Sequence, residues 1–164
     1  MIKQLNILIL TMFGIGNSKY APGSVASFVT CLIYICFFNF QVNIILLIIA
    51  LALIFLYSVL AIDALRNSFS EVDSKEIVID EFIGQSIPIL TIYSFLENRN
   101  IAFFILYTLI SFALFRLFDI WKPYPINKVD QNIKNGFGVV LDDIIAGIYS
   151  VVLLIVLILF INYV

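Results

Sequence analysis

Long apolar runs, separated by short polar segments, make up most of the 164-residue chain. A helix needs about 20 apolar residues to cross the hydrocarbon core of a bilayer, so runs near this length predict membrane-embedded helices. Charged residues occur in these runs only near their ends. The pattern therefore predicts an all-α, multi-helical integral membrane protein. We expect about five membrane-embedded helices, at residues 24–40, 44–62, 77–96, 101–120 and 138–164.

The N-terminal part of the chain follows a different pattern. The apolar run at residues 5–13 is too short to cross a bilayer, and it predicts an interfacial or re-entrant helix. Residues 14–24, GIGNSKYAPGS, combine glycines and a proline with polar side chains, which predicts a loop. Its backbone amides could bind an anion, because glycine lets a ligand approach closely. The alternative is that the segment is an ordinary turn without a ligand. The polar segments at residues 63–76 and 122–137 are also expected to be loops.

The composition supports a membrane protein. Hydrophobic residues make up 63% of the chain and charged residues 12%, whereas a soluble domain carries about 25% charged residues. The mean hydropathy is +1.12. The length fits one domain, residues 1–164. A net charge of −2, without a basic patch, gives no indication of a nucleic-acid partner.

The residue inventory excludes several kinds of catalytic site. The chain has no histidine, which excludes Ser-His-Asp chemistry and histidine-ligated zinc. Cys31 and Cys36 lie in one apolar run, and we expect them to serve packing rather than a disulfide or a metal.

The distribution of basic residues predicts the orientation in the membrane. With five spans, one side receives seven basic residues and the other side only Arg99. By the positive-inside rule, the first side is cytoplasmic. The same topology brings every acidic motif of the apolar runs to the cytoplasmic side. The seven basic residues are Lys3, Lys19, Arg66, Lys75, Lys122, Lys128 and Lys134.

Charges of both signs at the ends of apolar runs are the candidate chemistry. Carboxylates bind a hard cation such as Mg²⁺, while guanidinium and ammonium groups bind phosphate oxygens. The pattern therefore indicates a metal ion that holds a phosphate group. The candidate catalytic and metal-binding residues are Asp80, Glu81, Asp119, Asp142 and Asp143, and the candidate phosphate-binding residues are Arg116 and Lys122.

Each of these charges also has a purely structural interpretation. The acid pairs could be helix N-termini stabilised by the helix dipole, Arg116 and Asp119 could simply pair, and Lys122 could extend to the interface. A different function is also open, that of a small ion or metal transporter lined by the acid pairs, although transporter sites usually lie near the bilayer midplane. The remaining charges are expected to be solvated in loops: Asp63, Glu71, Glu76, Lys128, Asp130 and Lys134, with Asp73 unassigned.

Two segments form a weak internal repeat. IVIDEFIGQ and VVLDDIIAG each place a pair of acids between apolar residues. Gly84 and Ala146 follow the first acid of each pair by one helical turn, and small residues let membrane helices approach closely. The repeat predicts a helix pair that brings the two acid pairs together.

Four motifs in this order resemble the bacterial phosphatidylglycerophosphatase A family. They are APGSVAS at residues 21–27, IVIDEFIG at 77–84, FRLFDIWKPYPI at 115–126 and GFGVVLDDIIAG at 136–147. Two positions depart from the family pattern: Ala26 replaces a frequent glycine, and Asp73-Ser74 replaces a frequent aspartate-proline.

This resemblance implies an all-helical, magnesium-dependent phosphatase in the bacterial inner membrane. The distribution of basic residues places its active site on the cytoplasmic side. Its substrate would be a phospholipid in the bilayer, phosphatidylglycerophosphate, and its products phosphatidylglycerol and phosphate. The acidic motif residues of the family would fall on the five acids named above, and the basic ones on Arg116 and Lys122.

Overall fold

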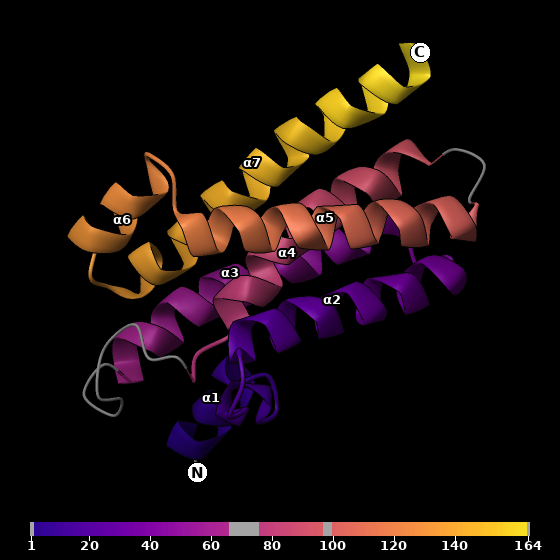
Figure 1. Cartoon of the computed structure of the whole chain (residues 1–164). Helices are drawn as coiled ribbons and strands as arrows, with labels where there is room; N and C mark the ends of the chain where they lie inside the picture. Colours follow the sequence, from indigo (N-terminus) through magenta and orange to yellow (C-terminus); the bar gives the residue numbers. More distant parts are fainter. Residues whose placement is uncertain (1, 66–75, 97–99, 164) are drawn as a thin grey trace.

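All elements that the computed structural model describes are helical, which confirms the all-α prediction. The described residues are 2–65, 76–96 and 100–163, and no strand occurs among them. Expectations for Arg66, Glu71, Asp73, Lys75 and Arg99 lie outside these ranges. The elements are α1 (Ile2–Leu10), a 3₁₀ turn (Ile15–Asn17), α2 (Pro22–Asn39), α3 (Ile44–Leu65), α4 (Ile79–Phe95), α5 (Ile101–Trp121), α6 (Ile126–Asn132) and α7 (Gly136–Tyr163) (Figure 1).

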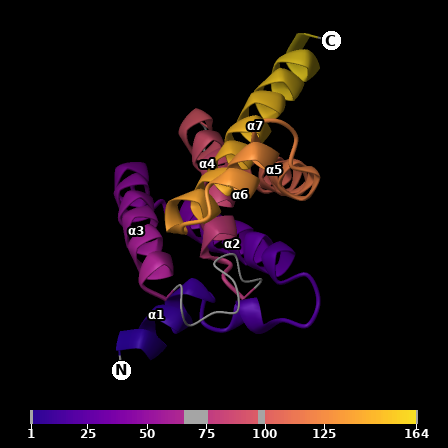
Figure 2. The same ribbon diagram turned by 90° about the vertical axis from the view of Figure 1, so that its left-hand side faces the viewer.

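Four of the described helices, α2, α3, α5 and α7, are long and apolar enough to cross a membrane. The expected fifth, α4, has 17 residues and occupies the centre of the bundle, in contact with these four helices. Figure 2 shows α3 and α5 on opposite sides of α4. Because α4 faces protein rather than lipid, it carries buried polar residues such as Gln85 and Ser86, which a lipid-facing helix would not tolerate.

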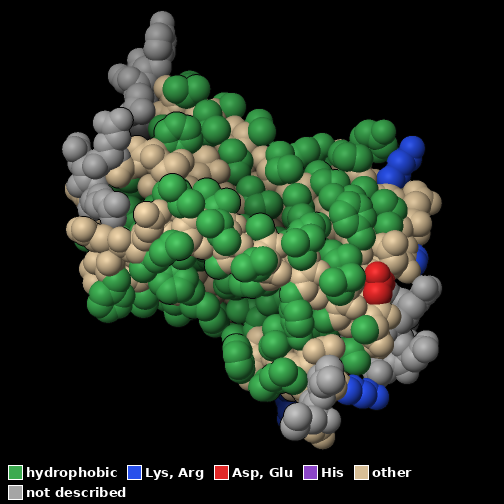
Figure 3. Space-filling model, turned by 180° about the vertical axis from the view of Figure 1, so that it is seen from behind, with side chains coloured by type: hydrophobic (Ala, Val, Ile, Leu, Met, Phe, Trp, Pro, Cys, Tyr) green, Lys and Arg blue, Asp and Glu red, His purple; other side chains and the backbone are tan. Residues whose placement is uncertain are grey.

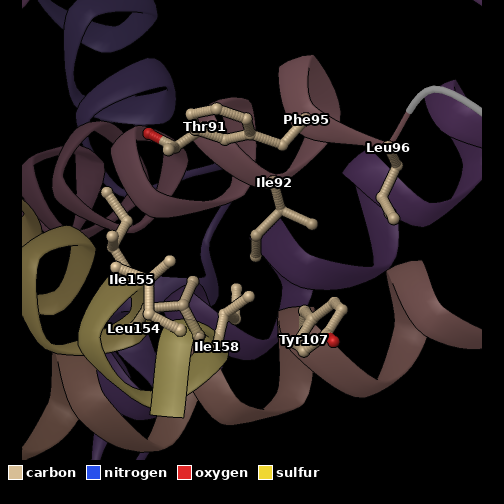
Figure 4. Close-up of a pocket in the computed structure, with 9 residues that line it drawn as sticks. Thr91, Ile92, Phe95, Leu96, Tyr107, Leu154, Ile155 and Ile158 are labelled. Atoms are coloured by element: carbon tan, nitrogen blue, oxygen red, sulfur yellow. The ribbon is translucent and has the colours of Figure 1, made fainter. Parts of the chain in front are cut away.

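Most of the outer surface is apolar, as a lipid environment requires. In Figure 3 hydrophobic side chains cover most of the visible face, and the coloured charged groups lie toward one end of it. At the other end, an apolar cavity of about 290 Å³ lies between α4, α5 and α7 (Figure 4). Ile92, Tyr107 and Leu154 are among the side chains that line it.

The backbones of α4 and α7 touch at two glycines. A Cβ atom on Gly84 would lie 2.6 Å from the carbonyl oxygen of Asp143, and one on Gly147 would lie 2.5 Å from the carbonyl oxygen of Gly84. The repeat therefore predicted this helix pair and the role of Gly84 correctly. Ala146 is fully buried and packs with Phe115 and Ile126, while the neighbouring Gly147 makes the backbone contact with α4.

Several predicted boundaries change in the structure. The N-terminal helix is residues 2–10 rather than 5–13, and the predicted loop at 14–24 contains a 3₁₀ turn. Pro22 begins α2 because its fixed φ suits the first helical position. The predicted loop at 122–137 contains α6, which the buried Ile126 attaches to the bundle. Helix α7 begins at Gly136, so Asp142 and Asp143 lie in its second turn.

Asp63 is exposed, as predicted, but it lies in the last turn of α3 rather than in a loop, and it joins α3 to α7. Its Oδ1 atom accepts a 2.6 Å hydrogen bond from the backbone amide of Gly136. A Cβ on Gly136 would lie 2.3 Å from the carbonyl oxygen of Val59, so the start of α7 lies directly on α3. This contact helps to fix the register of α7 and therefore the position of its acids.

An aromatic cluster holds α2, α4 and α5 together near the end of the bundle that carries the α2–α3 turn. The rings of Phe38 and Phe104 stack with 4.0 Å between centroids, and Tyr93 meets Phe104 edge to face at 5.7 Å. The hydroxyl of Tyr93 donates a 2.6 Å hydrogen bond to the carbonyl oxygen of Val42, which ties the cluster to the α2–α3 turn.

We predict that Phe104→Ala lowers the free energy of unfolding by about 3 kcal/mol or more, because it removes a fully buried ring from this cluster. Reversible unfolding in mixed micelles measures the loss. Phe103→Ala is the matched control, since the Phe103 side chain is 50% exposed. Equal losses in the two variants would contradict the proposed importance of the cluster.

Candidate active site

All seven candidate residues line one pocket of about 230 Å³. It lies at the end of the bundle where α2, α4 and α7 begin and where α5 ends (Figure 1). Four segments that are far apart in the sequence thus meet at one pocket. Neither the helix periodicity nor the spacing of the charged residues would by itself require them to meet. The lining residues are Ala21, Pro22, Gly23, Ile77, Asp80, Glu81, Arg116, Asp119, Lys122, Asp142 and Asp143.

Three carboxylates form the core of the pocket. Asp80, Glu81 and Asp143 each place an oxygen within 4.8 Å of the others. Asp143 is only 4% exposed, and no described residue forms a hydrogen bond with its Oδ2 atom. The same holds for the buried Oε2 atom of Glu81. Ionised carboxylates that are buried this close repel each other, so a proton or a cation has to lie among them, and oxygen ligands are those that Mg²⁺ prefers. These three residues therefore fit a hard divalent cation.

Arg116 lies between this cluster and Asp119. Its Nη1 atom forms an ion pair with Asp119 on the same face of α5, and it also lies 4.0 Å from Oε1 of Glu81. The Nε atom of Arg116 is buried and has no hydrogen-bond partner among the described residues. Pairing with Asp119 therefore does not use all of the guanidinium, which still has donors for an anion. Asp119 is associated with Arg116 and lies outside the three-carboxylate group.

Lys122 follows the last turn of α5 and is held by two acids. Its Nζ atom lies 2.8 Å from Oδ2 of Asp142 and 3.3 Å from Oδ1 of Asp130. Burial alone would lower the pKa of the Lys122 ammonium, but the hydrogen bond and charge attraction of Asp142, together with Asp130, raise that pKa above its ordinary value. Lys122 therefore stays protonated and presents a fixed positive charge to the pocket.

Asp130 is the contact that sequence reasoning missed, since we expected it to be a solvated loop charge. Helix α6 folds back and places Asp130 beside Lys122, while Lys134 lies 4.0 Å from the same oxygen. A signal was present in the sequence. Ile126 and Asp130 are four residues apart, so in a helix they share one face, and the buried Ile126 turns that face toward the bundle.

The two acid pairs differ in their position relative to the N-terminus of their helix, and therefore in how strongly the helix dipole acts on them. Asp80 and Glu81 lie in the first turn of α4, where the dipole favours a negative charge. Asp142 and Asp143 lie beyond the first turn of α7, outside the short range of that effect. The dipole therefore cannot account for the pair on α7, and Lys122 and the neighbouring helices provide its environment instead.

Comparison with known proteins shows the family to which this chain is similar. A family profile described as phosphatidylglycerophosphatase A matches residues 8–158. A Bacteroides thetaiotaomicron protein with the provisional name phosphatidylinositol-3-phosphatase is 36% identical over 153 residues, which cover 92% of this chain and 91% of that protein. No solved structure matches significantly.

Two proteins named phosphatidylglycerophosphatase A match a shorter region. The one from Haemophilus influenzae is 42% identical over 80 residues, covering 49% of this chain and 44% of the relative. The one from Escherichia coli is 37% identical over 78 residues, covering 48% of this chain and 41% of the relative. Since the family profile spans nearly the whole sequence, this chain belongs to the phosphatidylglycerophosphatase A family of phosphatases.

Proposed function

We propose that this protein is a magnesium-dependent phosphatase of the bacterial cytoplasmic membrane that hydrolyses phosphatidylglycerophosphate to phosphatidylglycerol and phosphate. One observation carries the proposal. A single pocket, at one end of an apolar bundle, combines three close carboxylates with a guanidinium and an ammonium group. A phosphate monoester at the membrane surface needs both kinds of group, and the family assignment indicates the same chemistry.

Asp80, Glu81 and Asp143 are the residues that would hold Mg²⁺. When bound, the ion would neutralise phosphate charge and make a coordinated water more acidic. Oε2 of Glu81 and Oδ2 of Asp143 have no hydrogen-bond partner among the described residues, so each still has the capacity to coordinate such an ion.

The remaining charged residues would bind and orient the substrate. Arg116 presents a planar fork of donors that suits two phosphate oxygens, and its pair with Asp119 keeps the fork in place. Lys122, held by Asp142 and Asp130, adds a point charge to the same anion. A carboxylate that is not bound to the cation would accept the proton of the attacking water, whose oxygen forms a bond to phosphorus as the bond to the glycerol oxygen breaks.

The apolar helices explain how a lipid would reach this pocket. Exposed apolar side chains cover α3, α5 and α7, so the bundle is solvated by acyl chains. The ends of the spans then lie at the depth of the phospholipid headgroups, where the charged pocket is. A lipid substrate can thus keep its acyl chains in the bilayer while its phosphate enters the pocket.

A second substrate class has a specific observation in its favour. The relative that matches along nearly its full length is named for phosphatidylinositol 3-phosphate. This lipid and phosphatidylglycerophosphate are both phosphomonoesters on a glycerolipid, and they differ in the alcohol that leaves. We favour phosphatidylglycerophosphate because the family profile and two relatives agree on it. The family assignment does not favour the transporter alternative.

We predict that purified protein in detergent releases phosphate from phosphatidylglycerophosphate faster than from phosphatidylinositol 3-phosphate. Exhaustive chelation should abolish this activity and added Mg²⁺ should restore it, because the carboxylate cluster needs its cation. Full activity after chelation would contradict the metal assignment, and a preference for the inositol lipid would contradict the substrate assignment.

Asp143→Asn should reduce turnover by about 100-fold or more at saturating Mg²⁺, because the lost charge acts on the cation and on the transition state. The variant should still fold and insert. Glu76→Gln is the matched control, since Glu76 is an exposed acid close to α4. Similar small losses in both variants would indicate that Asp143 has only a structural role.

Labelling of single cysteines introduced at Lys128 and Gln41, in a Cys31→Ala/Cys36→Ala background, tests the orientation. A membrane-impermeant reagent should reach position 128 only from the cytoplasmic side and position 41 only from the opposite side, because the two lie at opposite ends of the spans. Labelling of position 128 in intact spheroplasts would place the pocket on the outer face and refute the proposed topology.

A further inference from the structure

Gly23, in the first turn of α2, lies against the catalytic pocket without room for a side chain. A Cβ atom at this position would lie 1.9 Å from Oε1 and 2.9 Å from Cδ of Glu81. It would also lie 3.2 Å from Nη1 of Arg116. The backbone of α2 therefore forms a wall directly against the Glu81 carboxylate.

Backbone conformation does not explain this glycine. Gly14 is the described glycine with a positive φ, so Gly23 has a backbone that other residues can adopt. Space is the remaining reason, and the space is taken by Glu81. The neighbouring Ala21, at φ 44°, and Pro22 at the helix start together direct the first turn of α2 into the pocket.

The surroundings of Glu81 show what this wall does. Nη1 of Arg116 lies 4.0 Å from Oε1 of Glu81, on the same side of this oxygen as Gly23. The oxygens of Asp80 and Asp143 lie within the 4.8 Å cluster. The positive end of the α2 dipole also favours an anion at this point. Without the close approach of α2, the flexible Glu81 side chain would have room to turn away from the other two carboxylates.

We propose that Gly23 is a positioning residue that fixes the Glu81 carboxylate toward Asp80 and Asp143. The inference rests on the proposed function, because it assigns Glu81 to the cation site. Gly23 has no side chain with which to bind the cation or the phosphate. It acts by bringing the α2 backbone close enough to exclude the other positions of Glu81.

A larger residue at position 23 should displace Glu81 rather than α2. The following turns of α2 are anchored, since Ala26, Ser27 and Thr30 are fully buried. The end of a glutamate side chain moves more easily than an anchored helix. The effect should therefore appear in cation binding more than in stability.

The experiment compares Gly23→Ala, Glu81→Asp and the double variant as purified, full-length proteins in detergent. The first readout is the Mg²⁺ concentration that gives half of the maximal thermal stabilisation, and the second is phosphate release. Gly23→Ala should raise this concentration by about 10-fold or more. Its unfolding temperature without Mg²⁺ should stay close to that of the wild type. Val25→Ala, in the same turn, removes a partly exposed side chain and should change neither readout.

The double variant distinguishes a local contact from a general disturbance. Aspartate is one methylene shorter than glutamate and does not reach the new Cβ, so Gly23→Ala should change the Glu81→Asp protein by no more than about twofold. If Gly23→Ala alone does not yield folded protein, folding of the double variant supports the contact and its failure contradicts it. An unchanged Mg²⁺ response in Gly23→Ala, or the same loss in both backgrounds, would overturn the proposal.

The behaviour of the wild-type protein shows whether a negative result refutes the proposed function or only the role of Gly23. A wild type that neither responds to Mg²⁺ nor releases phosphate refutes the function. A wild type that does both, with a Gly23→Ala variant that behaves identically, refutes only the role of Gly23. If phosphate is released without a Mg²⁺ response, the same comparison of variants is made on turnover.

Discussion

The contact between the backbones of α4 and α7 is the constraint on which the rest of the structure depends. Gly84 and Gly147 allow it, because any side chain at either position would meet a carbonyl group of the other helix. The contact forces acids from two helices into one buried space, where three carboxylates lie within 4.8 Å of one another. Mutual repulsion of ionised carboxylates in such a place is unfavourable, and a proton or a bound cation relieves it.

The other elements hold this centre from outside. Asp63 accepts a hydrogen bond from the first backbone amide of α7, and the α2 backbone lies directly against the Glu81 carboxylate at Gly23. The basic side chains lie around the carboxylates rather than among them, each fixed by an acid of its own. The pocket is therefore divided into a negative centre, suited to a cation, and a positive margin, suited to a phosphate.

Much of this site could be predicted because charge is so rare in an apolar chain. Each acid or base at the end of an apolar run needs a reason to be there, and this reasoning selected seven residues that all line one pocket. A charged residue in a polar segment does not stand out from its neighbours in this way. Asp130 and Asp63 were assigned to solvent because the surrounding segments are polar, and the paths of α6 and α7 in the structure bring them to Lys122 and to Gly136.

The helices could also be predicted in kind and roughly in number, although α6 lies in a segment that was expected to be a loop. α4 satisfies the same apolar pattern as the lipid-facing spans, although it is buried by its neighbours, because hydropathy does not distinguish protein from lipid surroundings. The choice of Gly147 over Ala146 depends on the rotation of α7, which a one-turn spacing rule cannot resolve.

The central claim is that the acids joined by α4 and α7 form a divalent-cation site, and direct cation binding tests it. Mn²⁺, a paramagnetic substitute for Mg²⁺, can be titrated into the purified protein without substrate, and its free concentration followed by electron paramagnetic resonance. The structure predicts saturable binding that Mg²⁺ competes for and that Asp143→Asn strongly weakens, while Glu76→Gln leaves it unchanged. Equal Mn²⁺ binding by the wild type and Asp143→Asn would contradict it.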